Sequence, residues 1–157
     1  MYDSVGSKQE LVSRLNDLID AEAGVPAIAS AAAQSGDPWE IAGAPARVTR
    51  SILEHCGDIV RALVSGAAAE PELAAVLEEG HRRHLEGTGR MVDLLRKLDA
   101  LDVAVDPGEA AETLAAVADF RFALVLLESY GWSFDRLESW IAATSRTLVL
   151  GSPTPTR

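Results

Sequence analysis

Two histidines and a threonine, His81, His84 and Thr88, occupy positions where the chain could do chemistry. On a helical wheel all three lie within about 40° of an apolar stripe centred on Leu77 and Leu95. Polar groups that face a protein interior need hydrogen-bond partners. Two interpretations are open. These side chains line a pocket and orient a small ligand, or neighbouring groups satisfy them or the helix emerges to solvent there.

A metal site is a further interpretation of the same segment. Glu78 and His81 form one Glu-x-x-His pair, and His81 with His84 could chelate zinc if a third ligand were present. A di-iron bundle needs a second such pair, which the sequence lacks, and no cysteine cluster supports zinc. Cys56 beside His55 does not indicate nucleophilic catalysis, because neighbours in sequence need not align in space. We therefore expect no metal, no cofactor, no catalytic residues and no enzyme.

Arg121 is predicted to lie at the centre of the inner stripe of its helix, two turns before Glu128. A buried arginine must be paired or must bind an anion. It could pair with Glu128 or another carboxylate, or it could hold a ligand carboxylate through two parallel hydrogen bonds.

The composition suits one globular domain that does not bind nucleic acid by itself. The chain has 157 residues, of which 48% are hydrophobic and 24% charged, and a formal net charge of −10. DNA binding needs lysines and arginines that displace counterions from phosphates, so DNA repels most of this surface. The single cysteine, the absence of a signal-peptide pattern and the lack of a long apolar run lead us to expect a cytoplasmic protein with no membrane partner.

Capping residues and apolar spacing predict an all-α fold with about six helices. Ser7, Asp37, Asp106 and Ser133 are the predicted N-caps, and Pro71 is expected to open a further helix. The first predicted helix begins at Ser7 and weakens near Gly24 to Pro26, and the second begins at Asp37 and ends at a break at His55 to Asp58, after which a short helix follows. Three more helices are predicted over about Glu70 to Leu98, Pro107 to Tyr130 and about Phe134 to Leu150.

The polar residues and three apolar stripes predict a pocket inside the bundle. It should enclose about 300 Å³ or more and hold a small, largely apolar effector. Gly80, Gly87 and Gly89 in the long helix indicate either close helix packing or room for a ligand. The predicted ligand-binding residues are Ile52, His55, Ile59, Leu77, His81, His84, Thr88, Met91, Arg121 and Val125.

The predicted helix from Pro107 to Tyr130 is apolar on two sides, so one side should face a second subunit. Together with the last helix it is expected to form a two-fold, dimeric four-helix bundle that buries more than about 1,000 Å². The alternative is that both sides are covered within one subunit. The predicted interface residues are Phe120, Ala123, Leu127, Tyr130, Leu137, Trp140, Ile141, Thr144 and Leu148.

Three motifs, in this order, are similar to those of the tetracycline-repressor-like (TetR) family of transcriptional regulators. Tyr2, Ser7, Lys8 and Leu11 resemble the junction between the end of that family's recognition helix and the first helix of its ligand domain. A helix opened by Asp-Pro-Trp and ended at a histidine-containing break follows. The third motif is a turn between the last two helices, with the sequence Glu-Ser-Tyr-Gly-Trp-Ser over residues 128–133.

The resemblance implies the C-terminal, effector-binding and dimerisation part of such a regulator, without most of the N-terminal helix-turn-helix. Residues 1–6 would be the remnant of the DNA-binding domain and 7–151 the ligand and dimerisation domain. Independently of the resemblance, the glycine and prolines over 151–155 predict that 152–157 form a disordered tail. Tyr2 and Lys8 would be remnants of the DNA contacts, and operator DNA would be reached only through the missing N-terminal domain.

The function implied is regulation of transcription, usually repression, released when a ligand changes the relative angle of two subunits. Two alternatives belong to other classes. One is a helical-bundle enzyme or metal-binding protein that uses Glu78, His81 and His84. The other is a helical adaptor that dimerises without a ligand.

Overall fold

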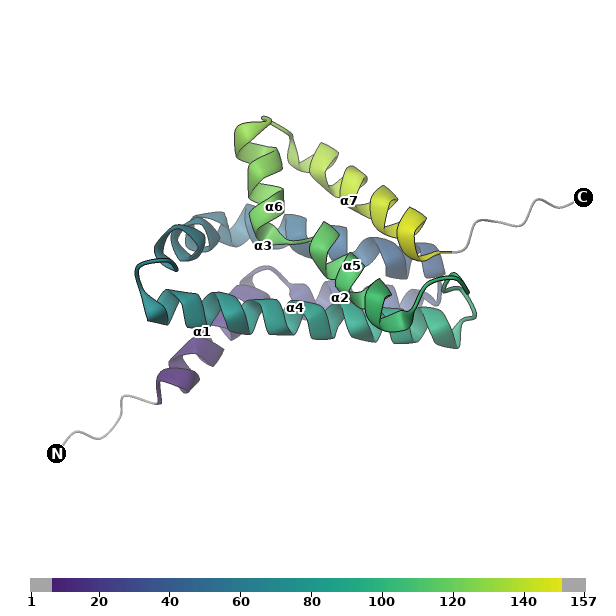
Figure 1. Ribbon diagram of the computed structural model, residues 1–157, viewed down its shortest axis with the longest axis horizontal. Coiled ribbons are helices and arrows are strands. Elements are labelled where there is room, and N and C mark those ends of the chain that lie inside the picture. The colour runs from purple at the N-terminus through teal and green to yellow at the C-terminus, as the bar shows by residue number, and fades with distance from the viewer. Residues whose placement is uncertain (1–6, 151–157) are drawn as a thin grey trace, which may run out of the picture.

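The computed structural model describes residues 7–150, and this part of the chain is a bundle of α-helices (Figure 1). It holds no β-strand, only an isolated antiparallel bridge between Leu101 and Leu150. The all-α prediction is therefore confirmed. The elements are α1 (Lys8–Glu22), α2 (Val25–Ser35), α3 (Pro38–Gly66), α4 (Pro71–Lys97), α5 (Pro107–Val117), α6 (Phe120–Leu124), the π-helical turn η1 (Val125–Ser129) and α7 (Phe134–Val149).

The predicted N-caps are confirmed by side-chain hydrogen bonds to the first turns of their helices. The backbone N–H of Trp39 donates to Asp37 Oδ1 at 2.9 Å, and the N–H of Arg136 donates to Ser133 Oγ at 3.2 Å. Ser7 and Asp106 accept in the same way at the starts of α1 and α5. Each cap satisfies an N–H that has no partner within the helix.

The two helix interruptions predicted near Gly24 and near His55 have different structures. Gly24 lies between α1 and α2 in the left-handed region, with φ of 64°, a conformation that glycine adopts without strain. The break expected at His55 to Asp58 is instead a kink, because Cys56 has φ of −124° and ψ of 18° while the helix continues to Gly66.

The predicted single helix from Pro107 to Tyr130 is wrong. The chain leaves the helical conformation at Asp119, which has φ of −64° and ψ of 132° and caps α6 by accepting the N–H of Arg121 at 2.8 Å. A wheel drawn across this break places residues on the wrong faces, because the second segment starts a new phase. Arg121 is therefore exposed rather than inward and pairs with Asp119, while Glu128 pairs with Arg61.

The long helices α3 and α4 run alongside each other, and the remaining helices pack on them (Figure 1). α2 packs on α3, α1 packs mainly on α4, α5 packs on α4, and α7 lies across α3. Two groups of buried apolar side chains form the core, one around Ile52, Leu137 and Ile141 and one around Leu95 and Leu114.

None of the helices in the described part of the chain is long and apolar enough to cross a membrane. The terminal segments predicted at 1–6 and 152–157, with Tyr2, lie outside the described residues.

Candidate ligand-binding cavity

A cavity of about 960 Å³, partly open to solvent, lies between α1, α2, α3, α4 and the start of α6. Most of its wall is aliphatic, because these helices turn their apolar stripes toward one another. Its apolar lining includes Ile19, Val25, Val48, Ile52, Leu63, Val76, Leu77, Met91 and Phe120. Polar side chains lie along α1 and α4. The volume is at the upper end of the range typical of small-molecule sites.

Seven of the ten predicted ligand-binding residues border this cavity. They are Ile52, Leu77, His81, His84, Thr88, Met91 and Arg121.

The other three, His55, Ile59 and Val125, do not line the cavity. His55 and Ile59 lie on the outward side of α3, and His55 Nδ1 is 2.8 Å from the carbonyl oxygen of Ser51 in its own helix. The inward side of this part of α3 is occupied by Ile52 and Val60. Val125 is 45% exposed because it follows the break at the start of α6.

His84 is held at the cavity wall by two contacts to the α5–α6 junction. Its Nε2 lies 3.1 Å from the carbonyl oxygen of Ala115, and its ring centroid is 5.6 Å from that of Phe120. Because a carbonyl can only accept, Nε2 carries the proton in this contact. Burial lowers the pKa of His84 below its usual value, against smaller raising effects of the Ala115 carbonyl and Asp119. The imidazole is therefore neutral at pH 7.

Thr88 is buried at the cavity wall, and α5 satisfies its hydroxyl. Thr88 Oγ1 lies 3.0 Å from the carbonyl oxygen of Ala111 on α5 and 3.0 Å from that of Leu85 in its own helix. For Thr88, and for one nitrogen of His84, partners within the protein satisfy the polar groups, as the second interpretation anticipated. Besides Leu85, the partners are the carbonyls of Ala111 and Ala115 on α5, which the periodicity of α4 could not reveal.

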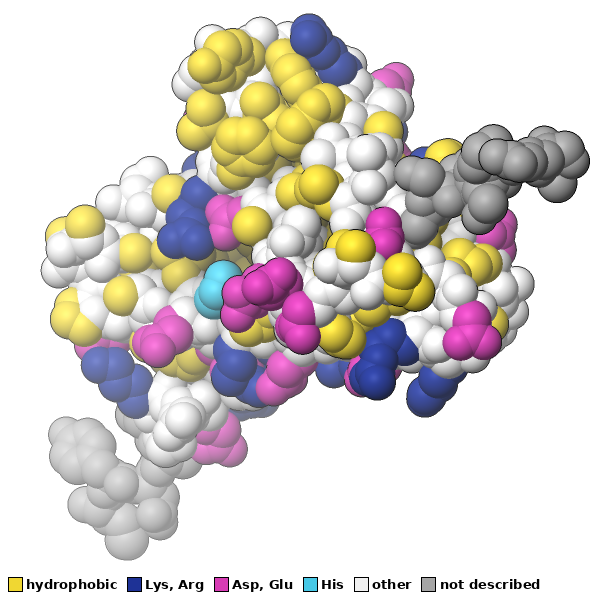
Figure 2. All heavy atoms as spheres, turned by 45° about the vertical axis from the view of Figure 1, so that its right-hand side comes forward, with side chains coloured by type: hydrophobic (Ala, Val, Ile, Leu, Met, Phe, Trp, Pro, Cys, Tyr) yellow, Lys and Arg dark blue, Asp and Glu magenta, His cyan; other side chains and the backbone are white. Residues whose placement is uncertain are grey.

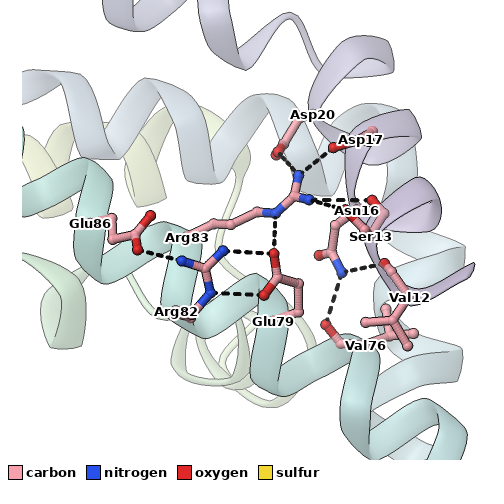
Figure 3. Close-up of polar contacts among 10 residues, drawn as sticks. All are labelled: Val12, Ser13, Asn16, Asp17, Asp20, Val76, Glu79, Arg82, Arg83 and Glu86. Carbon is pink, nitrogen blue, oxygen red and sulfur yellow. Dashed lines mark hydrogen bonds and ion pairs between the residues drawn. The ribbon is translucent and has the colours of Figure 1, made fainter. Parts of the chain in front are cut away.

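An arginine that sequence reasoning missed connects α4 to α1 beside the cavity (Figure 3). Arg83 Nη1 donates to Asp17 at 2.7 Å and to Asp20 at 3.2 Å, and Nη2 donates to Ser13 Oγ at 3.1 Å. Its Nε donates to Glu79 at 2.7 Å on the same helix. One guanidinium thus faces three carboxylates from two helices. The signal in the sequence was the highly charged run over 78–86, in which Glu79 and Arg83 are one helical turn apart.

Two carboxyl groups of this network have opposite pKa shifts. Hydrogen bonds from Arg82 and then Arg83 lower the pKa of Glu79 to about 2. Burial raises the pKa of Asp20, although Arg83 acts in the lowering direction. Asn16 lies next to them, and its Nδ2 donates to the carbonyl oxygens of Val12 at 3.0 Å and Val76 at 3.1 Å.

The residues considered for a metal site do not assemble one. His81 is exposed, and Nε2 of His84 faces a backbone carbonyl. Throughout residues 7–150, no three His, Cys, Asp or Glu side chains gather in a way that could hold a metal ion.

A second feature is an exposed apolar face at the end of the molecule formed by α6, η1 and the start of α7. Figure 2 shows hydrophobic side chains gathered at this end. We call Phe122, Val125, Trp132 and Trp140 the distal apolar face. The rings of Phe122 and Trp132 lie 5.8 Å and 5.9 Å from that of Trp140. Arg136 covers part of it, with its guanidinium carbon 4.1 Å from the centre of the Trp132 ring.

The predicted dimer residues divide between this end and the protomer's own core. Ala123, Leu137 and Ile141 are at most 1% exposed, so they are internal. Phe120 faces His84 and the cavity, and Leu127 packs on the core. The break at Asp119 explains these corrections on α6 and η1.

The remaining predicted dimer residues are accessible. Tyr130 and Leu148 are exposed, and Trp140 and Thr144 are half-buried. The exposed side chains of Phe122 and Val125 and the half-buried Trp132 were missed.

No family model, curated protein or solved structure matches this chain.

Proposed function

We propose that this chain is the effector-binding and dimerisation domain of a ligand-responsive transcriptional regulator of the TetR-like kind, in the usual case a repressor. The observation that carries the proposal is the cavity of about 960 Å³ within the bundle. An apolar wall with a few fixed polar groups is the usual composition of a small-molecule site. The ligand proposed is therefore small and largely apolar.

The distal apolar face supports the dimerisation part of the proposal. Large exposed apolar patches on small domains mark interaction sites. Phe122, Val125, Trp132 and Trp140 come from α6, η1, the turn that follows and α7, so a two-fold axis beside them would pair the α6–η1 segment and α7 of each subunit. The partner proposed for this face is a second copy of the chain.

The regulatory part rests on the similarity of residues 2–11, 37–57 and 128–133 to TetR-like regulators, and on the acidity of the chain. With a net charge of −10 the chain lacks the basic surface that DNA binding needs. DNA would be contacted by a helix-turn-helix joined before α1, and Lys8 would lie at that junction. A ligand acts in such a system by binding one arrangement of the subunits more tightly than another.

Binding to the cavity can be tested with an apolar probe and a variant that fills the space. Biphenyl should raise the thermal midpoint of the purified chain, because a ligand that binds only the folded state stabilises it. Ala29 on α2 lines the cavity, whereas Ala27 on the same helix is exposed and does not. The effect should disappear in Ala29→Phe and persist in Ala27→Phe. An equal effect in both variants would contradict binding in the cavity.

The regulatory part can be tested by fusion. The chain is joined behind a helix-turn-helix domain that binds its operator only as a dimer. We expect the fusion to bind its operator, to lose this binding when Val125 is replaced by a charged residue, and to change its operator affinity when a ligand occupies the cavity. Operator binding that changes neither with the Val125 substitution nor with the ligand would contradict the proposal.

A further inference from the structure

His84 holds one ring nitrogen that the fold does not use. Its Nε2 faces the carbonyl oxygen of Ala115, whereas among the described residues no hydrogen-bond partner is found for Nδ1. In the same part of the chain, only Ser145 Oγ is a side-chain N or O atom that is both sealed from solvent and without a hydrogen-bond partner. Because Nδ1 of His84 has no partner either, it is not sealed from solvent and can accept a hydrogen bond. His84 is also one of the residues that line the cavity.

The protonation state of this nitrogen follows from the contact on the other side of the ring. Ala115 presents only an acceptor, so the proton of the neutral imidazole is on Nε2 and Nδ1 carries a lone pair. Burial favours the neutral form. The ring of Phe120 stands beside the imidazole at 5.6 Å between centroids and limits its rotation. His84 thus carries a fixed acceptor on a residue of the cavity wall.

The other polar side chains considered at this end of the cavity already have partners. Thr88 donates to backbone carbonyls, and Arg121 is paired with Asp119 through two hydrogen bonds, at 3.1 Å from Nε and 2.8 Å from Nη2. At Thr88 and Arg121 a ligand acceptor would have to break one of these bonds, whereas at His84 a ligand donor can reach an unused lone pair. These three side chains therefore favour a ligand that carries a hydrogen-bond donor.

We infer that the cavity takes an apolar molecule that carries a hydroxyl donor, as phenols and alcohols do, with this donor bound to Nδ1 of His84. The inference rests on the proposed ligand-binding function and adds the class of ligand. His84 acts as a specificity residue, because an acceptor-only analogue of the same shape leaves its lone pair unpaired.

Three probes of similar shape separate the inference from the proposed function. They are 4-phenylphenol, which has a donor, 4-methoxybiphenyl, which has only an acceptor, and biphenyl, which has neither. Dissociation constants are measured by calorimetry at pH 7.5 on the full chain. One neutral hydrogen bond predicts about fivefold tighter binding of the phenol than of either analogue.

Variants at the histidines test the assignment. In His84→Phe the preference for the phenol should vanish, and in His84→Gln it should return, because glutamine can donate to Ala115 and accept from the ligand. His55→Phe is the matched control, since His55 faces outward, and it should keep the wild-type preference. In wild-type protein the ¹⁵N signal of His84 Nδ1, assigned by its loss in His84→Gln, should shift with the phenol only. This measurement does not depend on whether His84→Phe folds.

The outcomes are distinct. If none of the three probes binds, the proposed function and the inference both fail. If all three bind with equal affinity to the wild-type chain, the cavity binds ligands but the inference is overturned. A phenol preference that survives in a folded His84→Phe, or an unmoved Nδ1 signal, assigns the donor to another group and also overturns the inference.

Discussion

The hydroxyl of Thr49 on α3 lies 2.8 Å from the carbonyl oxygen of Ala118, at the break between α5 and α6. The hydroxyl of Thr88 and Nε2 of His84, both on α4, reach the carbonyl oxygens of Ala111 and Ala115 in α5. Three polar side chains from the two long helices thus hold the end of α5. The start of α6, which closes one end of the cavity, is positioned by these contacts.

Replacing Thr49 by valine should destabilise the protein by about 1–3 kcal/mol, because a buried carbonyl loses its partner while the shape is nearly kept. Thr49 is fully buried. The free energy of unfolding is measured by urea denaturation. Thr147→Val is the matched control, since this exposed threonine donates only to Ala143 in its own helix, and it should change stability by less than about 0.5 kcal/mol. Equal effects at both sites would remove the proposed role of Thr49.

The helix starts and the all-α class were predictable from the sequence, whereas the break at Asp119 was not. Ser7, Asp37, Asp106 and Ser133 are capping residues whose effect is local, so the sequence determines it directly. The segment around Asp119 has neither proline nor glycine. At the break, the carbonyl oxygens of Ala115 and Ala118 are contacted by His84 on α4 and Thr49 on α3, which are distant in sequence.

The prediction of the site followed the same division. The stripe on α4 identified His81, His84 and Thr88 at the cavity wall, because one uninterrupted helix keeps its phase over this stretch. Across the break that phase is lost, and Val125 was assigned the wrong side, whereas Arg121 borders the cavity as an exposed residue paired with Asp119. The partners of these residues are tertiary contacts, which periodicity within one helix does not contain.

The ion pairs of Glu79 predict a loss of stability in acid. A carboxylate whose pKa is lowered in the folded state stabilises the fold above its unfolded pKa, and this contribution is lost as the pH falls. For Glu79, with a pKa of about 2 against an ordinary 4.5, the loss occurs between about pH 5 and pH 2. Glu79→Gln should therefore be less stable than wild type at pH 7, and the difference should shrink toward pH 3. Chemical denaturation at a series of pH values measures this.

Two variants control the acid experiment. Asp20 has a raised pKa, so its contribution has the opposite sign and is lost as the pH rises. Asp20→Asn should accordingly destabilise the protein less than Glu79→Gln at pH 7. Glu112→Gln removes an exposed carboxylate that has no ion pair within residues 7–150, and it should leave the pH profile unchanged. If Glu79→Gln and Glu112→Gln give the same profile, the Arg82 and Arg83 pairs do not stabilise the fold.

The distal apolar face predicts a dimer that a single charge disrupts. Val125 is 45% exposed on this face, and Leu98 is 42% exposed at the far end of α4. Val125→Arg should convert the dimer to a monomer in sedimentation velocity, because an unpaired charge would be buried at the interface. Leu98→Arg should remain dimeric, and circular dichroism checks that both stay helical. A wild-type chain that sediments as a monomer at micromolar concentration would rule out the homodimer.

Two glycines of α4 should respond to alanine with opposite signs. At Gly89 an added Cβ would meet no atom within 4 Å, so Gly89→Ala should stabilise the helix by up to about 1 kcal/mol. At Gly80 the Cβ would lie 3.0 Å from Oδ1 of Asn16, the side chain that joins α1 to the carbonyl oxygen of Val76. Asn16 cannot turn away without losing that hydrogen bond.

Overpacking of this kind costs about 1–3 kcal/mol, which exceeds the gain in helix propensity, so Gly80→Ala should be net destabilising. Urea denaturation of both variants under the same conditions measures the two signs. The α1–α4 contact at Gly80 is therefore close packing, whereas the backbone at Gly89 has room beside it. If Gly80→Ala stabilises the protein as much as Gly89→Ala, the contact with Asn16 yields without cost, and α1 is held to α4 by the Arg83 ion pairs instead.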